Sequence, residues 1–289
     1  MRQRVVIAGL LATLGWLACS GCAVVRRRND RPTNEQVEQR HRLSQQAQQA
    51  IDARDLPRAE VLLGHLLSEA PNLAEAHHRL AGVYASADRL GDAEAAEMRA
   101  LEIDPDYVDA LSGLGLVRVR AGRYREALGP LDQAIDLEPR RATAQAARGR
   151  ALEALGRTED ALAAYFRALE LDPNDPVTLL RVATIQLQRQ QADQALARLD
   201  MVIERLPDDP EARFRRGQAY LALKQYPEAL ADLALAAEKL PARPDVLYTL
   251  ALAHEGQDNR PGALRIAERA LRLAPESTDV RVLTERLRR

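Results

Sequence analysis

Residues 111–139, LSGLGLVRVRAGRYREALGPLDQAIDLEP, predict two consecutive helices. Apolar and small residues recur at intervals of three and four in the first part, as on one face of a helix, and a second such series starts at Ala127. Gly122 separates the two series, because glycine accepts the left-handed conformation that ends a helix. Pro139 ends the second helix, since its ring disfavours helical geometry in the residue before it. The stretch therefore predicts a helical hairpin.

The proline of this hairpin recurs at a constant interval, without a shift in register, at Pro71, Pro105, Pro139, Pro173, Pro207, Pro241 and Pro275. Three further columns keep the same interval. The first contains only alanine: Ala59, Ala93, Ala127, Ala161, Ala195, Ala229 and Ala263. The second contains only alanine or glycine: Ala47, Ala81, Gly115, Gly149, Ala183, Gly217 and Ala251. The third contains small or apolar residues: Leu66, Ala100, Ala134, Ala168, Val202, Ala236 and Ala270.

Small residues at fixed positions indicate helices that cross closely. One hairpin cannot bury its apolar face alone, so successive hairpins are expected to stack around a continuous core.

The period, with its alanine and proline columns, resembles that of the tetratricopeptide repeat (TPR), whose unit has about 34 residues. The resemblance implies an all-α, right-handed superhelical solenoid of helix-turn-helix units, here seven repeats at residues 40–73, 74–107, 108–141, 142–175, 176–209, 210–243 and 244–277. The chain departs from the family pattern at the position of an early aromatic residue, which is replaced by Leu111, Leu179 and Leu247 or by His77, Gln145 and Arg213. Residues 278–289 continue the apolar rhythm, and we expect them to form a capping helix.

Residues 1–22 have the organisation of a secretory signal: arginines, an apolar run and small residues before Cys22. The end of this segment resembles a bacterial lipoprotein signal, which implies cleavage before Cys22 and lipidation of its thiol. Cys19 is an alternative lipidation site. Ala23 after the cysteine resembles the signal for sorting to the outer membrane of a two-membrane bacterium, with the repeats facing the periplasm or the exterior.

An uncleaved membrane anchor is a further alternative, because the apolar run continues to Val25 and reaches about 21 residues, enough to span a bilayer. Residues 23–39 are expected to form a tether and the start of the first helix, for which Thr33 and Gln36 predict a capping box. Both interpretations place the repeats at a membrane surface in the cell envelope.

Several classes of function are disfavoured by composition and spacing. The formal net charge of −1 and the aromatic content of 3% argue against nucleic acid as a partner. His77 and His78 are adjacent and point in different directions on a helix, so they cannot share a metal without a distant third ligand. The other three histidines, His41, His65 and His254, are far apart in the sequence, and the glycines form no phosphate-binding loop. We therefore predict no catalytic activity, no metal, no cofactor and no small-molecule substrate.

In the family that the chain resembles, the first helices line a concave face that binds a peptide or a partner's helix. Four columns of each first helix are predicted to face it, and in the third repeat these are residues 109, 112, 116 and 119. In the last three repeats the apolar residues of these columns predict one partner-binding groove, formed by Leu180, Leu187, Phe214, Leu221, Tyr248 and Leu252. Packing between neighbouring repeats is the alternative explanation for them.

The predicted function is a membrane-tethered scaffold or adaptor that binds partner proteins in a bacterial envelope, in a role such as secretion, pilus or wall assembly. The alternative is a structural or self-associating envelope protein without a ligand groove.

Overall fold

The computed structural model describes residues 33–289, so Cys19, Cys22 and the remainder of the predicted signal lie outside the described residues. The described part is all-α, with fifteen helices and no strand. Helices α1 to α14 form hairpins of consecutive helices, and α15 follows the last of them. The predicted all-α solenoid is confirmed.

The first helices of the hairpins are α1 (Asn34–Asp52), α3 (Ala74–Ser86), α5 (Val108–Arg120), α7 (Ala142–Ala154), α9 (Pro176–Gln188), α11 (Pro210–Ala222) and α13 (Pro244–Gly256). The second helices are α2 (Leu56–Glu69), α4 (Leu90–Ile103), α6 (Tyr124–Leu137), α8 (Thr158–Leu171), α10 (Ala192–Arg205), α12 (Tyr226–Lys239) and α14 (Arg260–Leu273). Helix α15 (Thr278–Arg288) begins at the same point of the repeat as α13, in the place of a further first helix. Its Leu283 and Leu287 pack on α13 and α14 and cover the end of the core.

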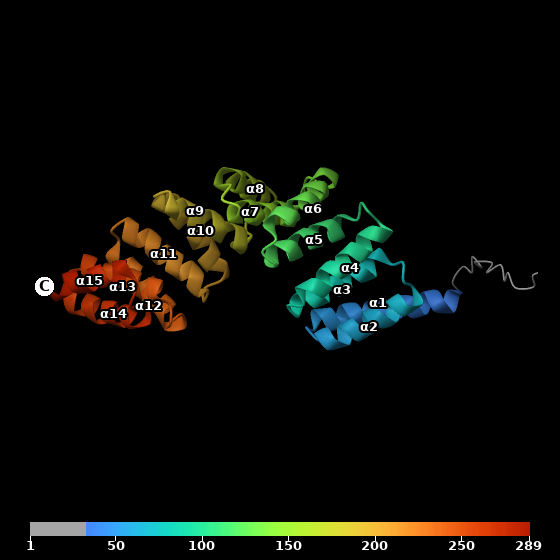
Figure 1. Ribbon diagram of the computed structural model, residues 1–289, viewed down its shortest axis with the longest axis horizontal. Coiled ribbons are helices and arrows are strands. Elements are labelled where there is room, and N and C mark those ends of the chain that lie inside the picture. Colours follow the sequence, from blue (N-terminus) through green and yellow to red (C-terminus); the bar gives the residue numbers. More distant parts are fainter. Residues whose placement is uncertain (1–32) are drawn as a thin grey trace, which may run out of the picture.

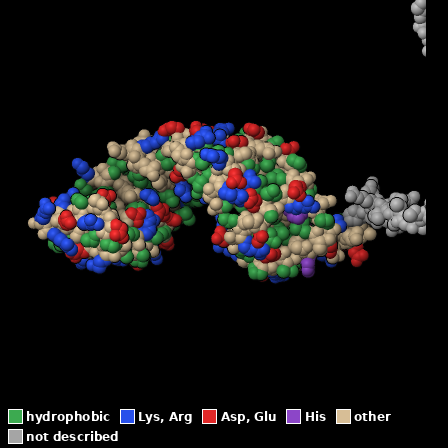
Figure 2. Space-filling view, viewed as in Figure 1, with side chains coloured by type: hydrophobic (Ala, Val, Ile, Leu, Met, Phe, Trp, Pro, Cys, Tyr) green, Lys and Arg blue, Asp and Glu red, His purple; other side chains and the backbone are tan. Residues whose placement is uncertain are grey.

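The hairpins follow one another along an arch, with α1 and α2 at one end and α14 and α15 at the other (Figure 1). The space-filling view shows a hollow beneath the middle of the arch, between its two arms (Figure 2). Each second helix packs on the first helix of the next hairpin, and the apolar clusters follow this path through the stack. Stability therefore rests on contacts between neighbours in the chain.

The small residues of the repeat lie where the two helices of each hairpin cross. All members of the alanine column have no exposed surface: Ala59, Ala93, Ala127, Ala161, Ala195, Ala229 and Ala263. In the column of alanine or glycine, a Cβ added to Gly149 would lie 2.6 Å from the ring of Tyr165, and one added to Gly217 would lie 2.5 Å from Cγ of Leu233. These distances are too short for carbon atoms, so the close crossings predicted from the columns are confirmed.

Every hairpin turns through a residue with positive φ, which occupies the same column in each repeat. Gly122 and Gly156 have φ of 74° and 75° there. The other hairpins carry non-glycine residues with φ of 57–60°: Arg54, Asp88, Gln190, Lys224 and Asp258. A left-handed conformation costs these residues about 1–2 kcal/mol each, which the packing of the two helices offsets. The fold therefore imposes the left-handed conformation at this position, and glycine is the residue that adopts it with the least strain.

Candidate partner-binding site

Two adjoining clefts open along the first helices in the middle of the solenoid. The first cleft has a volume of about 210 Å³ and lies between α7 and α9, with lining residues also from α5 and α8. The second cleft has a volume of about 290 Å³ and lies between α9 and α11. Val177 and Arg181 of α9 line both clefts, so the two form one continuous track.

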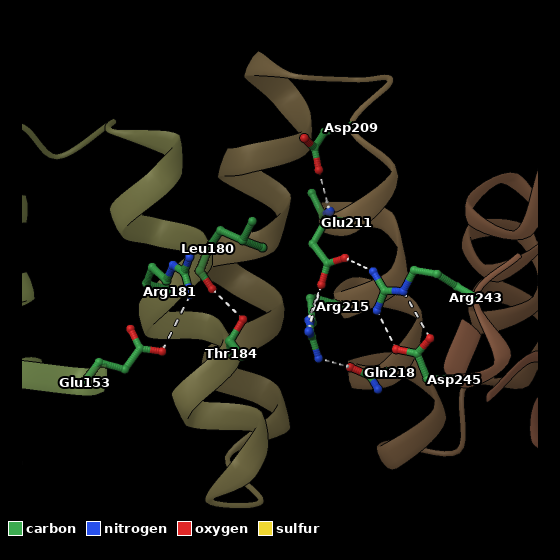
Figure 3. Close-up of polar contacts among 11 residues, drawn as sticks. Glu153, Leu180, Arg181, Thr184, Asp209, Glu211, Arg215, Gln218, Arg243 and Asp245 are labelled. Carbon is green, nitrogen blue, oxygen red and sulfur yellow. Dashed lines mark hydrogen bonds and ion pairs between the residues drawn. The ribbon is translucent and has the colours of Figure 1, made fainter. Parts of the chain in front are cut away.

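Neighbouring junctions are closed by an arginine that stands just before a first helix. Arg141, before α7, forms an ion pair with Asp109 of α5. Arg243, before α13, forms ion pairs with Glu211 of α11 and Asp245 of α13 (Figure 3). The hydrogen bond from Arg243 holds the pKa of Asp245 below its ordinary range. Each arginine thus joins consecutive first helices across the inner end of the junction.

The two open junctions have aspartate in place of that arginine. Asp175 accepts hydrogen bonds from the backbone N–H groups of Val177 and Thr178 at the start of α9. Asp209 accepts one from the N–H of Ala212 at the start of α11 (Figure 3). Both carboxylates therefore cap their own helices instead of bridging to the preceding repeat. The clefts open where the bridge between first helices is missing.

Small side chains widen the first cleft further. Helix α7 is rich in alanine, and Ala142, Ala146 and Ala147 line the cleft wall. Helices α7 and α9 hardly touch each other, whereas α5 packs on α7 and α9 packs on α11. Apolar side chains remain in solvent at its edges, with exposed fractions of 41% for Leu116 and 53% for Val177. The result is an apolar recess with an open mouth.

Arginines border this track. Arg150 of α7 and Arg181 of α9 both line the first cleft, and Arg215 of α11 lines the second. Figure 3 shows Arg181 directed toward Glu153 of α7, at a nitrogen–oxygen distance of 3.8 Å. Arg215 is held more tightly, at 2.7 Å from Glu211.

The carboxylates near the first cleft are already engaged. Glu153 accepts a hydrogen bond of 2.6 Å from the hydroxyl of Tyr165, whose pKa is raised by burial and by this carboxylate. Asp172 accepts one from the backbone N–H of Asn174. Arg150, in contrast, has no hydrogen bond or ion pair with any other residue of the part that the structure describes. The lining of the first cleft is therefore mixed in charge, with Arg150 and Arg181 beside Asp172 and Asp175.

The six residues predicted to form one apolar groove do not lie on one exposed strip. Five are half-buried and contact the core clusters: Leu180, Leu187, Leu221, Tyr248 and Leu252. Of these, Leu180 lines the second cleft.

Phe214 is 1% exposed and belongs to the core, so its prediction as a groove residue is wrong. Helix α13 packs on α11 and covers the ring with Val246 and Leu247. The guanidinium groups of Arg215 and Arg243 lie 5.0 and 5.1 Å from the ring centroid.

The residues that shape the clefts were not predicted from the sequence. Val177 occupies one of the columns predicted to face the groove. It is an apolar residue where other repeats carry Glu75, Asp109, Glu211 or Asp245. Asp175 and Asp209 stand in the same column as the bridging residues Arg141 and Arg243, and this difference was a second available signal.

A separate polar cluster joins α3, α4 and α5. The carboxylate of Glu97 is buried beneath Gly113, and both of its oxygens lie 3.0 Å from Nδ1 of His78. Burial lowers the pKa of His78, but the hydrogen bond and the charge of Glu97 together outweigh burial. The net shift is upward from the ordinary value, with further contributions from Asp109, which raises the pKa, and Arg141, which lowers it.

This shift predicts that the solenoid loses stability as pH rises. A His78 pKa that is higher in the folded chain than in the unfolded chain adds stability in full below about pH 6.5. That contribution is lost as pH rises through the folded-state pKa. Urea unfolding over a series of pH values should therefore give a larger difference in stability between the parent and His78→Gln at pH 6 than at pH 8. A constant difference would show that His78 does not bind its proton more tightly in the folded chain. His254, whose pKa burial lowers, is present in both chains and cancels in the comparison.

Two negative findings concern residues 33–289. In that range no three His, Cys, Asp or Glu side chains are grouped so that they could hold a metal ion. None of the helices described there combines the length and hydropathy needed to cross a membrane.

Fold and site together define an α-helical repeat solenoid with a recess on its first helices. Two family models described as tetratricopeptide repeat match the chain, one over residues 113–176 and the other over residues 152–219. These matches cover the middle hairpins, residues 113–219, and together with the structure they support a tetratricopeptide repeat protein. A comparison with curated proteins gives no match.

Solved structures with the same fold include the APC/C hetero-tetramer Cut9-Hcn1, with a TM-score of 0.66 and 16% identity, covering 78% of this chain and 45% of that one. A tetratricopeptide repeat protein from Parabacteroides merdae has a TM-score of 0.56 and 17% identity, covering 87% of this chain and 100% of that one. MamA from Desulfovibrio magneticus RS-1 has a TM-score of 0.53 and 22% identity, covering 59% of this chain and 97% of that one. At these identities the similarities show the fold.

Proposed function

We propose that this protein is a membrane-tethered scaffold of a bacterial cell envelope that binds a segment of a partner protein along α7, α9 and α11. The TPR fold is that of a protein–protein interaction scaffold. The observation that carries the proposal is the pair of adjoining clefts, with Val177 half in solvent between them. Concave apolar surface with a few placed polar groups is the usual form of a binding site.

The tether in this proposal rests on the sequence of residues 1–22. A lipid on Cys22, or on Cys19, would hold the first hairpin close to the membrane and leave the central clefts facing the aqueous side. Arg26, Arg27 and Arg28 follow the cysteine, and basic residues beside a lipid add about 1 kcal/mol each of attraction to an anionic membrane surface.

The test is site-specific photo-crosslinking in cells that express the full chain. With benzoylphenylalanine in place of Val177, we expect one discrete adduct with another protein in the membrane fraction. The matched control is Leu235 of α12, which is exposed to a similar degree but lies on a second helix, and it should give no such adduct.

The outcomes separate the parts of the proposal. An adduct at twice the mass of the chain would favour the self-associating alternative, and adducts of equal yield at both positions would contradict a specific site. Cys22→Ser should leave the chain uncleaved and without lipid. If Cys22→Ser still acquires lipid, Cys19 is the modified residue; if the parent carries no lipid at all, the lipoprotein proposal fails.

A further inference from the structure

The junction between α8 and α9 is the least packed of the junctions between hairpins. Helix α8 contacts α9 less extensively than any other second helix contacts the first helix that follows it. On the inner side of the junction α7 and α9 hardly touch, and the first cleft occupies the space between them. At the two ends of the solenoid α1 and α3, and α13 and α15, also hardly touch, but α2 packs on α3, and α14 on α15, more extensively. The weakest contact of the stack therefore lies in its middle.

The outer half of this junction is well packed and can act as a pivot. Tyr165 of α8 shares a core cluster with Val182 and Ile185 of α9, and all three side chains are almost fully buried. Only residues 172–175 link the two helices, so the helices cannot separate far. Relative movement of α8 and α9 is therefore a rotation about this buried contact.

The inner half of the junction has little to fix the angle of that rotation. Arg181 of α9 lies 3.8 Å from Glu153 of α7, which already accepts the hydroxyl of Tyr165. Arg189 of α9 is paired with Glu159 of α8, but the side chain of Glu159 is 81% exposed. Exposed ion pairs contribute little to stability. Neither pair is expected to hold α9 in one orientation.

The apolar lining of the first cleft favours a second arrangement of the junction. Leu116 of α5 and Val177 of α9 line this cleft with exposed fractions of 41% and 53%. Rotation of α9 toward α7 would remove part of this surface from water, which is favourable for apolar groups. An open and a closed arrangement can then both be populated.

The position of the junction turns a local rotation into a large movement. Figure 1 shows α7, α8 and α9 in the middle part of the arch, with the first three hairpins on one side and the last hairpins and α15 on the other. Movement of domains about a few residues is a common form of conformational change. A rotation here changes the width of the hollow between the two arms (Figure 2).

We infer that the α8/α9 junction is a hinge, about which residues 33–171 and residues 176–289 move as two rigid bodies, and that the first cleft closes when α9 rotates toward α7. The hinge is a property of the isolated chain, so it goes beyond the proposed function and does not depend on it.

Pulsed dipolar EPR on the full chain purified in detergent measures this movement. Spin labels are attached to pairs of p-acetylphenylalanine residues, a reaction that leaves cysteines unlabelled. The pairs come from one exposed column of the second helices and are two repeats apart: Arg99 with Arg167, Gln133 with Met201, and Arg167 with Leu235. The first pair lies within the N-terminal body and is the matched control, whereas the other two pairs span the hinge. The distribution of distances should be at least twice as wide for the spanning pairs as for the control pair. Three equal widths would overturn the inference.

A designed ion pair tests whether the movement takes place at the first cleft. Thr143 and Asp175 line this cleft and occupy the columns of Asp109 and Arg141, which bridge the preceding junction. The variant Thr143→Asp/Asp175→Arg should therefore join α7 to α9 and narrow the distributions of both spanning pairs to the width of the control pair. Asp175→Arg alone lacks the acidic partner and should leave them wide. Circular dichroism melting establishes that each variant is folded. Distributions that stay wide in the double variant would overturn the inference.

The distances are measured without a partner protein. Failure of the hinge is therefore distinguishable from failure of the proposed function, which the crosslinking at Val177 tests.

Discussion

Phe214→Glu is expected to unfold the C-terminal hairpins. The ring is 1% exposed and lies in a cluster with Leu233, Leu247 and Val246. Loss of a buried phenylalanine side chain alone costs about 3–5 kcal/mol, and a carboxylate in its place must also lose its water. Arg215 and Arg243 lie near the ring, but their guanidinium groups are already paired with Glu211 and Asp245, so they offer little compensation.

Circular dichroism during urea titration measures this effect. Because each hairpin contacts only its neighbours, the region from α11 to α15 should unfold in an early separate step while the N-terminal hairpins persist. Phe214→Ala should show the same step at higher urea. Val177→Glu is the matched control, since that side chain is 53% exposed and should leave the curve nearly unchanged. If Phe214→Glu melts like the parent chain, the ring lies in an open groove, as the repeat register alone had predicted.

Phe214 also shows how far a repeat register can predict a site. Its column contains, in chain order from the second repeat, His78, Ser112, Ala146, Leu180, Phe214 and Tyr248. The register correctly places all of them on first helices. Whether such a residue is exposed depends on the side chains that the next first helix brings over it. Phe214 is covered by α13, whereas Ala146 opens onto the space between α7 and α9.

The columns of small residues were predictable for a different reason. A close helix crossing restricts volume in the same way in every repeat, so the restriction appears as a constant residue type. The clefts depend on residues that differ from repeat to repeat, and these leave no periodic signal. The column just before each first helix is an example, since it contains Leu73, Tyr107, Arg141, Asp175, Asp209, Arg243 and Ser277. A residue in this column predicts an open or a closed junction only when the residue that it would pair with on the preceding first helix is known.

Buried charge was the second feature that the pattern did not reveal. Arg213 stands where the repeat family has a large aromatic residue, and the sequence alone showed only that this aromatic residue is replaced. In the structure, Asp232 of α12, which is 3% exposed, accepts hydrogen bonds from Arg213 at 3.0 Å and from Arg216 at 2.6 and 3.1 Å. Arg216 is also bound to Asp200 of α10 at 2.8 Å. An ionic network therefore replaces an apolar contact between α10, α11 and α12.

Asp232→Ala should destabilise the chain by about 3 kcal/mol, because removal of one partner leaves buried charge without compensation. This is the low end of the range for a broken buried pair, since Arg216 keeps Asp200 and both arginine side chains are about one-fifth exposed (20% and 19%). Urea unfolding at pH 7 measures the loss.

The matched control removes the whole network at once. The triple variant carries the substitutions Arg213→Leu, Arg216→Leu and Asp232→Ile. They introduce the residues that the α13–α14 hairpin has at the same columns, namely Leu247, Leu250 and Ile266. Apolar replacement of a complete buried ion network is often neutral or stabilising, so the triple variant should be at least as stable as the parent chain. If Asp232→Ala alone matches the parent, the two arginines reach water without cost and the network contributes no stability. If the triple variant is as unstable as Asp232→Ala, the ion pairs themselves hold α11 on α12. Apolar residues taken from another repeat then cannot replace the ion pairs at these three positions.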